Sequence, residues 1–435
     1  MRYKPTMKFV EVPSPKPSRT VPREGPPPEG EIVTIDTSGG SALPQRRSGE
    51  ALDPRVSFLL VLEELLSKET ACDERAVTKA IEARSVASLK ALGADLRCYE
   101  RFVAEEGGVG LPATPERLSR WIDDLEDRGQ KPATITRKIA SLAAVHKIMG
   151  EPSVSSAPLV KDSLSGMRRR KGTAQRQAGG LRLGDPIGKA AVRGFSIKAL
   201  LDACDGDPTG LRDAALLSLG YDAGLRVSEL MATRAEHLSL EEDSCGQLEL
   251  PRSKTDQEGQ GAFAFVSPDT MRRISAWCEV AAIKSGPLFR RIMVRRTKAI
   301  APRRMLRHSD LAPNQAVDPD RMKARPGRQA GTTFTVGEHA LTRAAIAAII
   351  KKRARLALDY GTVNLGSANE EEAVAALSTH SLRVGLTQDL FANGEDAGSI
   401  AQALRWSSPG TAIRYGRKLA PQSNAAARLL AKRRS

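Results

Sequence analysis

Apolar residues recur three and four positions apart through much of the chain, which is the pattern of amphipathic helices. From about residue 85 to residue 167 the pattern predicts four helices in succession. The first has an apolar stripe formed by Leu89, Leu92, Leu96, Tyr99 and Val103. The second begins at Thr114–Pro115, a capping residue followed by proline at the first helical position. The others begin near Pro132 and at Pro158. We expect a compact helical domain here, preceded by one extra helix over residues 55–67.

A second region, with mixed patterns, begins near residue 195. Three helices and one β-hairpin are predicted there, over residues 196–204, 209–221 and 338–358 and over strands 247–250 and 262–266. Two more helices are expected after residue 379, separated by Asn393–Gly394. The chain is therefore expected to be mainly α with a small β-sheet, and to consist of a helical domain followed by an α+β domain.

The remaining segments complete the expected domain organisation. The division is a tail at 1–52, a helical domain at 53–167, a linker at 168–194 and a second domain at 195–435. The tail is dense in Pro, Ser, Gly and Arg, so it cannot bury enough apolar surface to offset its chain entropy and is expected to be disordered. Within the second domain, residues 290–333 are expected to be an inserted basic loop and residues 420–435 a C-terminal helix.

The linker is unusually basic. A structural connection needs no such charge, whereas a segment that crosses a phosphate backbone does, because each neutralised phosphate releases counterions. We therefore expect it to contact DNA. The residues expected to do so are Arg168, Arg169, Arg170, Lys171, Arg176 and Arg182.

The net charge indicates the class of binding partner, and the cysteine pattern indicates the cellular compartment. Lys plus Arg number 67 and Asp plus Glu 51, a formal charge of +16. This excess favours a polyanion, with nucleic acid ahead of an anionic membrane, although solvated surface arginines are the plain alternative. The five cysteines are scattered without a C-x-x-C pair, which argues against a zinc site and fits a reducing cytoplasm. No apolar run approaches ~18 residues, so no membrane span is predicted.

The densest chemistry lies in residues 379–417. His380 and Arg383 are one helical turn apart, so both side chains can reach a common point. Trp406 follows, and Tyr415 comes nine residues after it. An arginine neutralises phosphate oxygens, an imidazole hydrogen-bonds them or moves a proton, and a phenol can attack phosphorus. The segment therefore predicts chemistry on a phosphodiester.

Three residues of the second domain extend this set. Arg226 leaves a tight turn that begins at Gly224, and Glu229 follows one helical turn later. Lys254 lies in the hairpin loop, where a long ammonium side chain can swing into a groove. Taken singly, Arg226 and Glu229 are equally compatible with a surface ion pair, and Lys254 with a solvated charge.

Together these residues resemble the tyrosine recombinase (phage integrase) family. The matching set, in chain order, is Arg226, Lys254, His380, Arg383, Trp406 and Tyr415. The resemblance extends over roughly residues 85–435, since PATPERLSRWIDDL and the run from Thr134 to Gly150 are similar to the family's core-binding domain. Most members have a second histidine where this chain has Trp406. Tryptophan there, together with HSLRVG and RSKTD, resembles the Cre-like branch.

The resemblance implies a helical core-binding domain of SAM-like fold and an α+β catalytic domain. It also implies that Tyr415 attacks the scissile phosphate, forming a 3′-phosphotyrosyl bond and freeing a 5′ hydroxyl, with no metal, other cofactor or ATP. Lys254 would protonate the leaving 5′ oxygen, and His380 would hydrogen-bond the phosphate and assist proton transfer at the tyrosine.

The same resemblance assigns the remaining residues to charge stabilisation and orientation. Arg226 and Arg383 would hold the non-bridging phosphate oxygens in the transition state. Trp406 would donate its indole N–H to a phosphate oxygen and, unlike histidine, could not carry a proton. Glu229 would orient the arginine and histidine side chains.

The implied partner is double-stranded DNA with a specific target site, held in a two-domain clamp. The free protein is expected to be a monomer, and four subunits would join two sites and pass through a Holliday junction. We expect a cytoplasmic, nucleoid-associated bacterial protein with no membrane contact. Two other functions stay open: a type IB topoisomerase or telomere resolvase with the same chemistry, and a non-catalytic DNA-binding relic. The intact set that includes Tyr415 weighs against a relic.

Overall fold

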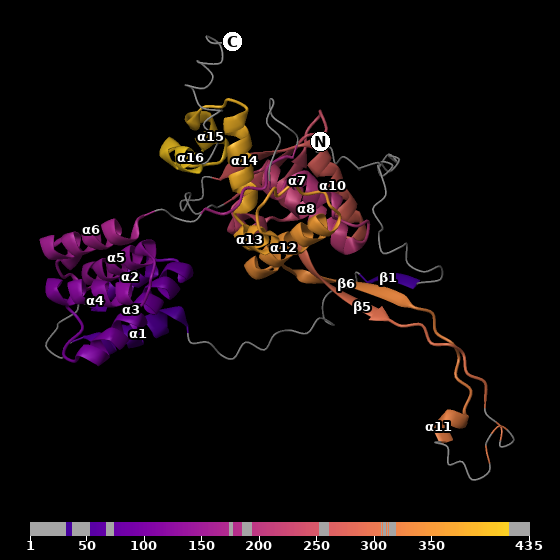
Figure 1. The fold of residues 1–435 in the computed structure, drawn as a ribbon, viewed down its shortest axis with the longest axis horizontal. Coiled ribbons are helices and arrows are strands. Elements are labelled where there is room, and N and C mark those ends of the chain that lie inside the picture. Colours follow the sequence, from indigo (N-terminus) through magenta and orange to yellow (C-terminus); the bar gives the residue numbers. More distant parts are fainter. Residues whose placement is uncertain are drawn as a thin grey trace, which may run out of the picture. The chain divides into compact units, whose positions relative to one another are not determined.

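The computed structural model divides the chain into two compact units, residues 45–176 and residues 1–44 with 177–435. It describes residues 32–36, 53–66, 74–173, 177–184, 194–251, 261–305, 307, 310, 312 and 319–416. Several sequence predictions lie outside these residues, namely those for Arg176, Lys254, the helix at 420–435 and most of the tail. We call the two parts the helical unit and the catalytic unit, and describe each by itself (Figure 1).

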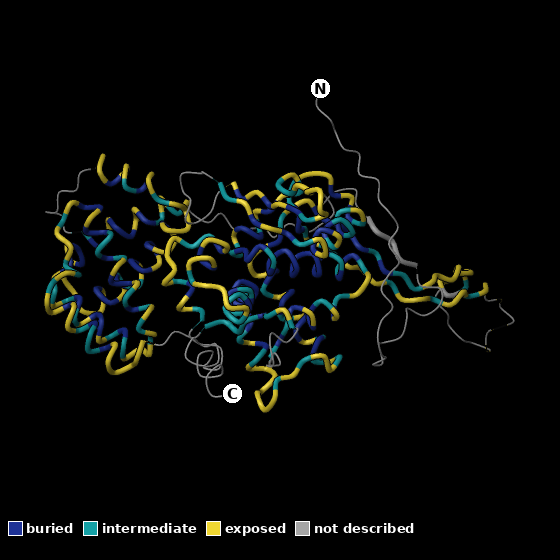
Figure 2. Tube along the Cα trace, turned by 90° about the horizontal axis from the view of Figure 1, so that it is seen from above, coloured by how far each residue is buried: buried dark blue, intermediate teal, exposed yellow. Residues whose placement is uncertain are grey.

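The helical unit consists of six α-helices in its described residues. They are α1 (Pro54–Leu65), α2 (Glu74–Glu82), α3 (Val86–Glu106), α4 (Pro115–Asp127), α5 (Pro132–Met149) and α6 (Pro158–Lys171). Thr114 caps α4 by accepting a hydrogen bond from the Arg117 N–H. Tyr99 and Trp121 meet edge to face in the core, with ring centroids 4.9 Å apart. The buried sides of these helices form one core (Figure 2).

Two details of this unit differ from the sequence prediction. Helix α2 was not predicted, because its nine residues carry only two buried apolar side chains, Val77 and Ile81. Helix α6 continues four residues beyond Met167, through the basic run, and ends at Lys171 before Gly172. Arginine and lysine are good helix formers and are favourable near a helix C-terminus. The first residues assigned to the linker are thus part of the helical unit.

The catalytic unit is built around α8, a helix buried along most of its length. Its helices are α7 (Ile197–Asp202), α8 (Pro208–Asp222), α9 (Val227–Ala232), α10 (Pro268–Val280), α11 (Pro319–Met322), α12 (Arg343–Asp359), α13 (Glu370–Ala376), α14 (Ser381–Ala392), α15 (Ala397–Ala403) and α16 (Pro409–Gly416). Helices α7, α10 and α14 all contact α8 (Figure 1). None of the described helices in the chain has the length and apolar character to cross a membrane.

A small antiparallel sheet carries the loop expected to hold Lys254. Its strands are β2 (Leu238–Leu240), β3 (Gly246–Leu250) and β4 (Ala262–Val266), in the order β2-β3-β4. The predicted hairpin is present, with Gln247 opposite Phe265. With this sheet and the many helices, the predicted fold class, mainly α with a small β-sheet, is confirmed.

The expected loop at residues 290–333 is wrong at both ends, because strands β5 (Arg290–Thr297) and β6 (Gly331–Ala340) pair there. Apolar and β-branched residues face each other across the ladder, such as Ile292 opposite Val336, and this pairing outweighs the basic neighbours. Further bridges, for example Ile300 with Arg328, extend the pairing outward. We call residues 290–340 the β-arm; α11 lies toward its far end (Figure 1).

The β-arm corrects two other predictions. Residues 338–340 belong to β6, so the helix predicted from residue 338 begins only at Arg343, where the Thr342 side chain caps α12. Strand β1 (Ile32–Asp36) pairs with β6 in parallel, although it falls in the predicted disordered tail. The run IVTID is apolar and β-branched enough to add to the edge of β6.

Residues 177–184, in the middle of the predicted linker, lie on the catalytic unit. The Leu181 N–H donates to the Ser381 carbonyl at 2.9 Å, and the Leu183 N–H donates to Asp389 Oδ2 at 2.6 Å. The Tyr221 hydroxyl also donates to Asp389 at 2.6 Å. Burial, and then the Asp389 charge, raise the pKa of Tyr221. This segment therefore fixes the position of α14, the helix that starts at the candidate site.

Candidate active site

The candidate site forms where three chain segments meet: the turn between α8 and α9, the start of α14, and the α15–α16 connection. Gly224 makes the first turn possible because it has φ of +53° and because a Cβ there would collide with the Leu404 side chain. The chain therefore brings the end of α8 against the end of α15. This close approach sets residues 226 and 405 beside each other.

Arg226 and Glu229 form the first pair of the site. Arg226 Nη1 donates to Glu229 Oε1 at 2.7 Å, and the Arg226 backbone N–H donates to Glu229 Oε2 at 2.9 Å. Burial opposes ionisation of Glu229, but these hydrogen bonds and the nearby charge outweigh it, so the pKa of Glu229 is lowered. The carboxylate is thus held ionised behind the arginine. The carboxylate was also expected to orient His380, but among the described residues the hydrogen bonds of the Glu229 carboxylate go to Arg226 and Arg405.

Arg383 is fully buried at the base of the site. Its Nη1 donates to the Gly224 carbonyl at 2.6 Å and its Nη2 donates to the Leu404 carbonyl. Its Nε has no hydrogen-bond partner within the described structure. Burial, and then repulsion by Arg226, lower the pKa of Arg383 to about 9, so it is still charged at neutral pH. A buried cation with an unsatisfied donor is suited to receive an anion.

His380 and Tyr415 are in direct contact. The two heavy atoms, His380 Nε2 and the Tyr415 hydroxyl oxygen, are 2.6 Å apart. Burial, and then the charges of Arg383, Arg226 and Arg343, lower the pKa of His380. A neutral imidazole accepts the phenol's hydrogen bond through Nε2, which is the arrangement a general base needs.

Trp406 lies between the cation and the phenol. The Arg383 guanidinium carbon is 4.8 Å from the centre of the indole ring, and the Tyr415 ring stacks on the indole at 5.2 Å with planes 6° apart. Stacking restrains both side chains. The structure thus brings together six of the seven residues selected from the sequence, and Lys254 lies outside the described residues.

Comparisons with known proteins point the same way. The chain is 27% identical over 246 residues to an integrase/recombinase xerD homolog of Selenomonas ruminantium, covering 54% of this chain and 68% of the relative. It is 24% identical over 323 residues to the recombinase cre of Escherichia phage P1, covering 74% and 80%. The chain is a tyrosine recombinase. No family model matches its sequence.

The fold of this tyrosine recombinase is shared with solved relatives. It aligns with the XerH site-specific recombinase bound to a palindromic difH substrate in a post-cleavage complex, with a TM-score of 0.51 and 14% sequence identity. The alignment covers 88% of this chain and 97% of that one. The family predicted from the sequence, and the enzyme class with it, are confirmed, and the Cre-like branch stays a prediction.

The basic residues expected to contact DNA lie in different settings. Arg168, Arg169, Arg170 and Lys171 are exposed on the last turns of α6, where Arg170 also pairs with Glu126 at 2.6 Å. The Nε of Arg182 donates to Asp389 at 2.6 Å and anchors the 177–184 segment, and its contact with DNA stays a prediction. Its partner lies more than two hundred residues away in sequence, so no local pattern could reveal the pair. Lys254 itself lies outside the described residues, between β3 and β4.

One residue of the site, Arg405, was not predicted from the sequence. Its φ is +54° and its guanidinium donates to the Ala223 carbonyl at 2.9 Å. An arginine directly before Trp406 was the only available signal, and it does not distinguish a buried side chain from an exposed one.

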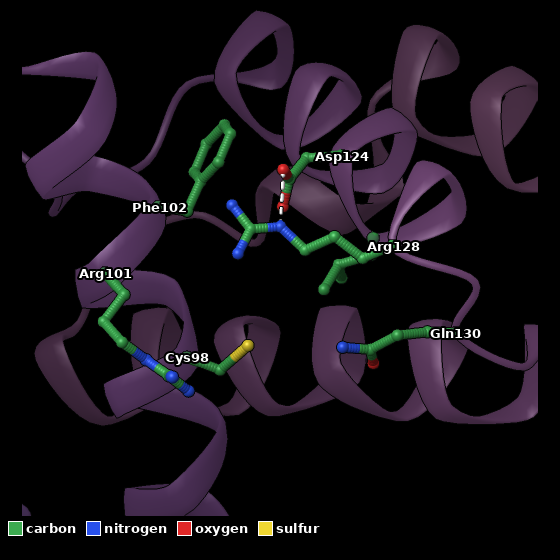
Figure 3. Close-up of a pocket in the computed structure, with 7 residues that line it drawn as sticks. Cys98, Arg101, Phe102, Asp124, Arg128 and Gln130 are labelled. Carbon is green, nitrogen blue, oxygen red and sulfur yellow. Dashed lines mark hydrogen bonds and ion pairs between the residues drawn. The ribbon is translucent and has the colours of Figure 1, made fainter.

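The recombinase also has a small cavity in its helical unit, away from these residues. It has a volume of about 130 Å³, and Cys98, Asp124, Arg128 and Gln130 are among the residues that line it (Figure 3). Arg128 is held there by an ion pair to Asp124 at 2.8 Å. The cavity belongs to the packing between α3 and α4 and contains none of the residues predicted for catalysis.

Proposed function

We propose that this recombinase cleaves and rejoins double-stranded DNA at a specific site through a 3′-phosphotyrosyl intermediate on Tyr415. The observation that carries the proposal is the 2.6 Å contact between the Tyr415 hydroxyl and a half-buried His380 Nε2, next to the buried Arg383. A phenol, a neutral base and a cation with an unsatisfied donor are the groups that attack on a phosphodiester requires.

In the first step, the Tyr415 oxygen forms a bond to phosphorus and the bond from phosphorus to the 5′ oxygen breaks. His380 Nε2 takes the phenol proton, and Lys254 gives a proton to the departing 5′ oxygen. Rejoining reverses these transfers when a 5′ hydroxyl of another strand attacks the phosphotyrosine. The number of phosphoester bonds stays constant, so the reaction needs no ATP, and the resemblance to the family implies that it needs no metal.

Arg226 and Arg383 stabilise the negative charge that grows on the non-bridging oxygens. In the described structure the Nε of Arg383 has no hydrogen-bond partner, while its two terminal nitrogens hold backbone carbonyls. Trp406 holds the Tyr415 ring by stacking and offers its indole N–H to a phosphate oxygen. Tryptophan at this position is also the feature that favours the Cre-like branch.

Two relatives support DNA as the partner, since their names describe a recombinase and an integrase/recombinase. We propose that the free protein is a monomer and that four copies join two target sites and exchange strands through a Holliday junction. The exposed basic turns of α6 would add phosphate contacts. In the cell, such a protein acts on DNA in the nucleoid.

A nicked suicide substrate tests the proposal. Duplex DNA from the flanks of the gene is nicked near the cleavage position, so that the short cleaved fragment diffuses away and the covalent complex accumulates. We expect a covalent protein–DNA band on a denaturing gel, with the attached residue mapping to Tyr415. Tight binding to flank DNA without a covalent band would instead favour a DNA-binding protein without strand transfer. Relaxation of supercoiled DNA that lacks any flank sequence would favour a topoisomerase.

A further inference from the structure

Arg405 occupies a backbone position that normally suits glycine. Helix α15 ends in a Schellman motif, in which the Trp406 N–H donates to the Ala401 carbonyl at 2.8 Å and the Arg405 N–H donates to the Gln402 carbonyl at 3.0 Å. This motif places Arg405 in the left-handed region, with φ of +54°. The same position after α8 and α14 is taken by Gly224 and Gly394. An arginine there strains the backbone without improving the end of the helix.

The side chain of Arg405 is buried, which makes its presence still less favourable for folding alone. Only 9% of the side chain is exposed, and its Nε has no hydrogen-bond partner in the described structure. Burial is the main reason that the pKa of Arg405 is lowered from its ordinary value. A strained and partly unsatisfied arginine is expected where the position serves function.

Arg405 connects the α15–α16 connection to the turn between α8 and α9, both through its side chain and through its backbone carbonyl. Its Nη2 donates to the Ala223 carbonyl at 2.9 Å and lies 3.5 Å from Glu229 Oε2. In return, Arg226 Nη2 lies 3.4 Å from the Arg405 carbonyl oxygen, at the limit of a hydrogen bond. The Glu229 carboxylate is therefore shared, with Oε1 on the Arg226 guanidinium and Oε2 between the Arg226 backbone and Arg405.

We propose that Arg405 is a positioning residue, which fixes the Glu229 carboxylate and, through it, the guanidinium of Arg226 in the place where the scissile phosphate binds. The inference rests on the proposed function and deepens it. Two guanidinium groups, those of Arg226 and Arg405, contact one carboxylate here, and the charge of Arg383 also interacts with that carboxylate. The cluster therefore keeps excess positive charge for an anion while each arginine is held by a directed hydrogen bond. Arg405 itself need not touch the DNA.

Replacement by glycine separates this role from a structural one. Arg405→Gly removes the guanidinium, and with it the donor to the Ala223 carbonyl, but it also relieves the left-handed backbone. Because these two effects oppose each other, we expect a thermal midpoint close to that of the wild type and an unchanged DNA dissociation constant. The single-turnover cleavage rate on the suicide substrate should nevertheless fall on the order of 10–100-fold, as expected when a catalytic group loses its placement. Arg405→Lys, which keeps the charge and can reach one acceptor, should recover part of the rate.

The matched control is Ala282→Gly. Ala282 follows α10 in the same Schellman geometry, with φ of +51°, and is exposed. This change relieves the same strain without removing a guanidinium, so it should raise the thermal midpoint and leave cleavage unchanged. A second readout is the double variant with Glu229→Gln. If Arg405 acts through Glu229, adding Arg405→Gly to Glu229→Gln should slow cleavage no further.

Three results would overturn the inference alone while wild-type protein cleaves: an Arg405→Gly variant at the wild-type rate, a thermal midpoint that falls together with the rate, or losses that multiply in the double variant. Absence of the covalent product already in wild-type protein would overturn the proposed function, and the inference with it. The wild-type lane of the same gel therefore distinguishes the two failures.

Discussion

The candidate active site and the β-arm both contain several arginines, but they hold these side chains in different ways. In the site, Arg226, Arg383 and Arg405 are buried or half-buried and donate to specific carboxylate or carbonyl oxygens. In the β-arm, Arg291, Arg295 and Arg296 are exposed, and none has an ion pair within the described residues.

The difference separates geometry from charge. A buried guanidinium with fixed partners presents its remaining N–H groups in one direction. Its side chain is already ordered in the folded protein, so no further conformational entropy is lost when it binds a phosphate. An exposed arginine contributes positive charge that counterions screen. We therefore expect changes in the site to slow the chemical step and changes in the β-arm to alter DNA affinity and its salt dependence.

The largest effect is expected at Tyr415, the proposed nucleophile. Tyr415→Phe keeps the ring that stacks on Trp406 but removes the attacking oxygen, so DNA binding should persist while covalent product falls on the order of 10⁶-fold. The measurement is the covalent band on the suicide substrate. Tyr360→Phe, at the end of α12, is the control and should cleave normally. A covalent band of normal intensity with Tyr415→Phe would contradict the mechanism.

The next largest effect is expected at Arg383, where the geometry of the guanidinium can be tested separately from its charge. Arg383→Lys keeps a charge, but one ammonium group cannot hold the Gly224 and Leu404 carbonyls and also contact a phosphate. Single-turnover cleavage should fall on the order of 10²–10³-fold, and the thermal midpoint should fall because buried carbonyls lose their donors. Arg355→Lys, at an exposed ion pair on α12, should leave both unchanged. Wild-type cleavage by Arg383→Lys would show that charge alone suffices in the site.

The sequence predicts local interactions in the two regions well, but it does not predict contacts between residues that are far apart in the chain. Spacing alone places His380 and Arg383 on one helical face, and Gly224 marks the turn before Arg226, because these relations are local. The pairing of β5 with β6 joins residues about forty positions apart. The many arginines of β5 also obscured the alternation of apolar and polar residues that indicates a strand. The conformation of Arg405 could not be predicted, since its acceptors come from a distant helix end.

The protonation state of His380 gives a third test of the site. The imidazole must be neutral to accept the Tyr415 proton, and its pKa is lowered from 6.5 by burial and by neighbouring cations. Cleavage should therefore stay on its plateau at pH 6.5 and fall only as the pH drops below the lowered pKa. His380→Gln should remove this acid limb and slow cleavage on the order of 10²-fold. An acid limb centred above pH 6.5 would contradict a neutral, buried base.

The smallest effect per residue is expected in the β-arm. Exposed arginines act by releasing counterions, so the double change Arg295→Gln with Arg296→Gln should reduce the slope of log affinity against log salt by about 0.9 for each phosphate that the variant no longer neutralises. Cleavage at saturating DNA should be unchanged, because neither residue holds a group of the site. The control removes the same charge from α10, through Arg272→Gln with Arg273→Gln, whose side chains pair with Asp269 at 2.8 and 2.9 Å. If both double variants shift the slope equally, the β-arm contributes only net charge; if the β-arm variant alone shifts it, the arm contacts DNA directly.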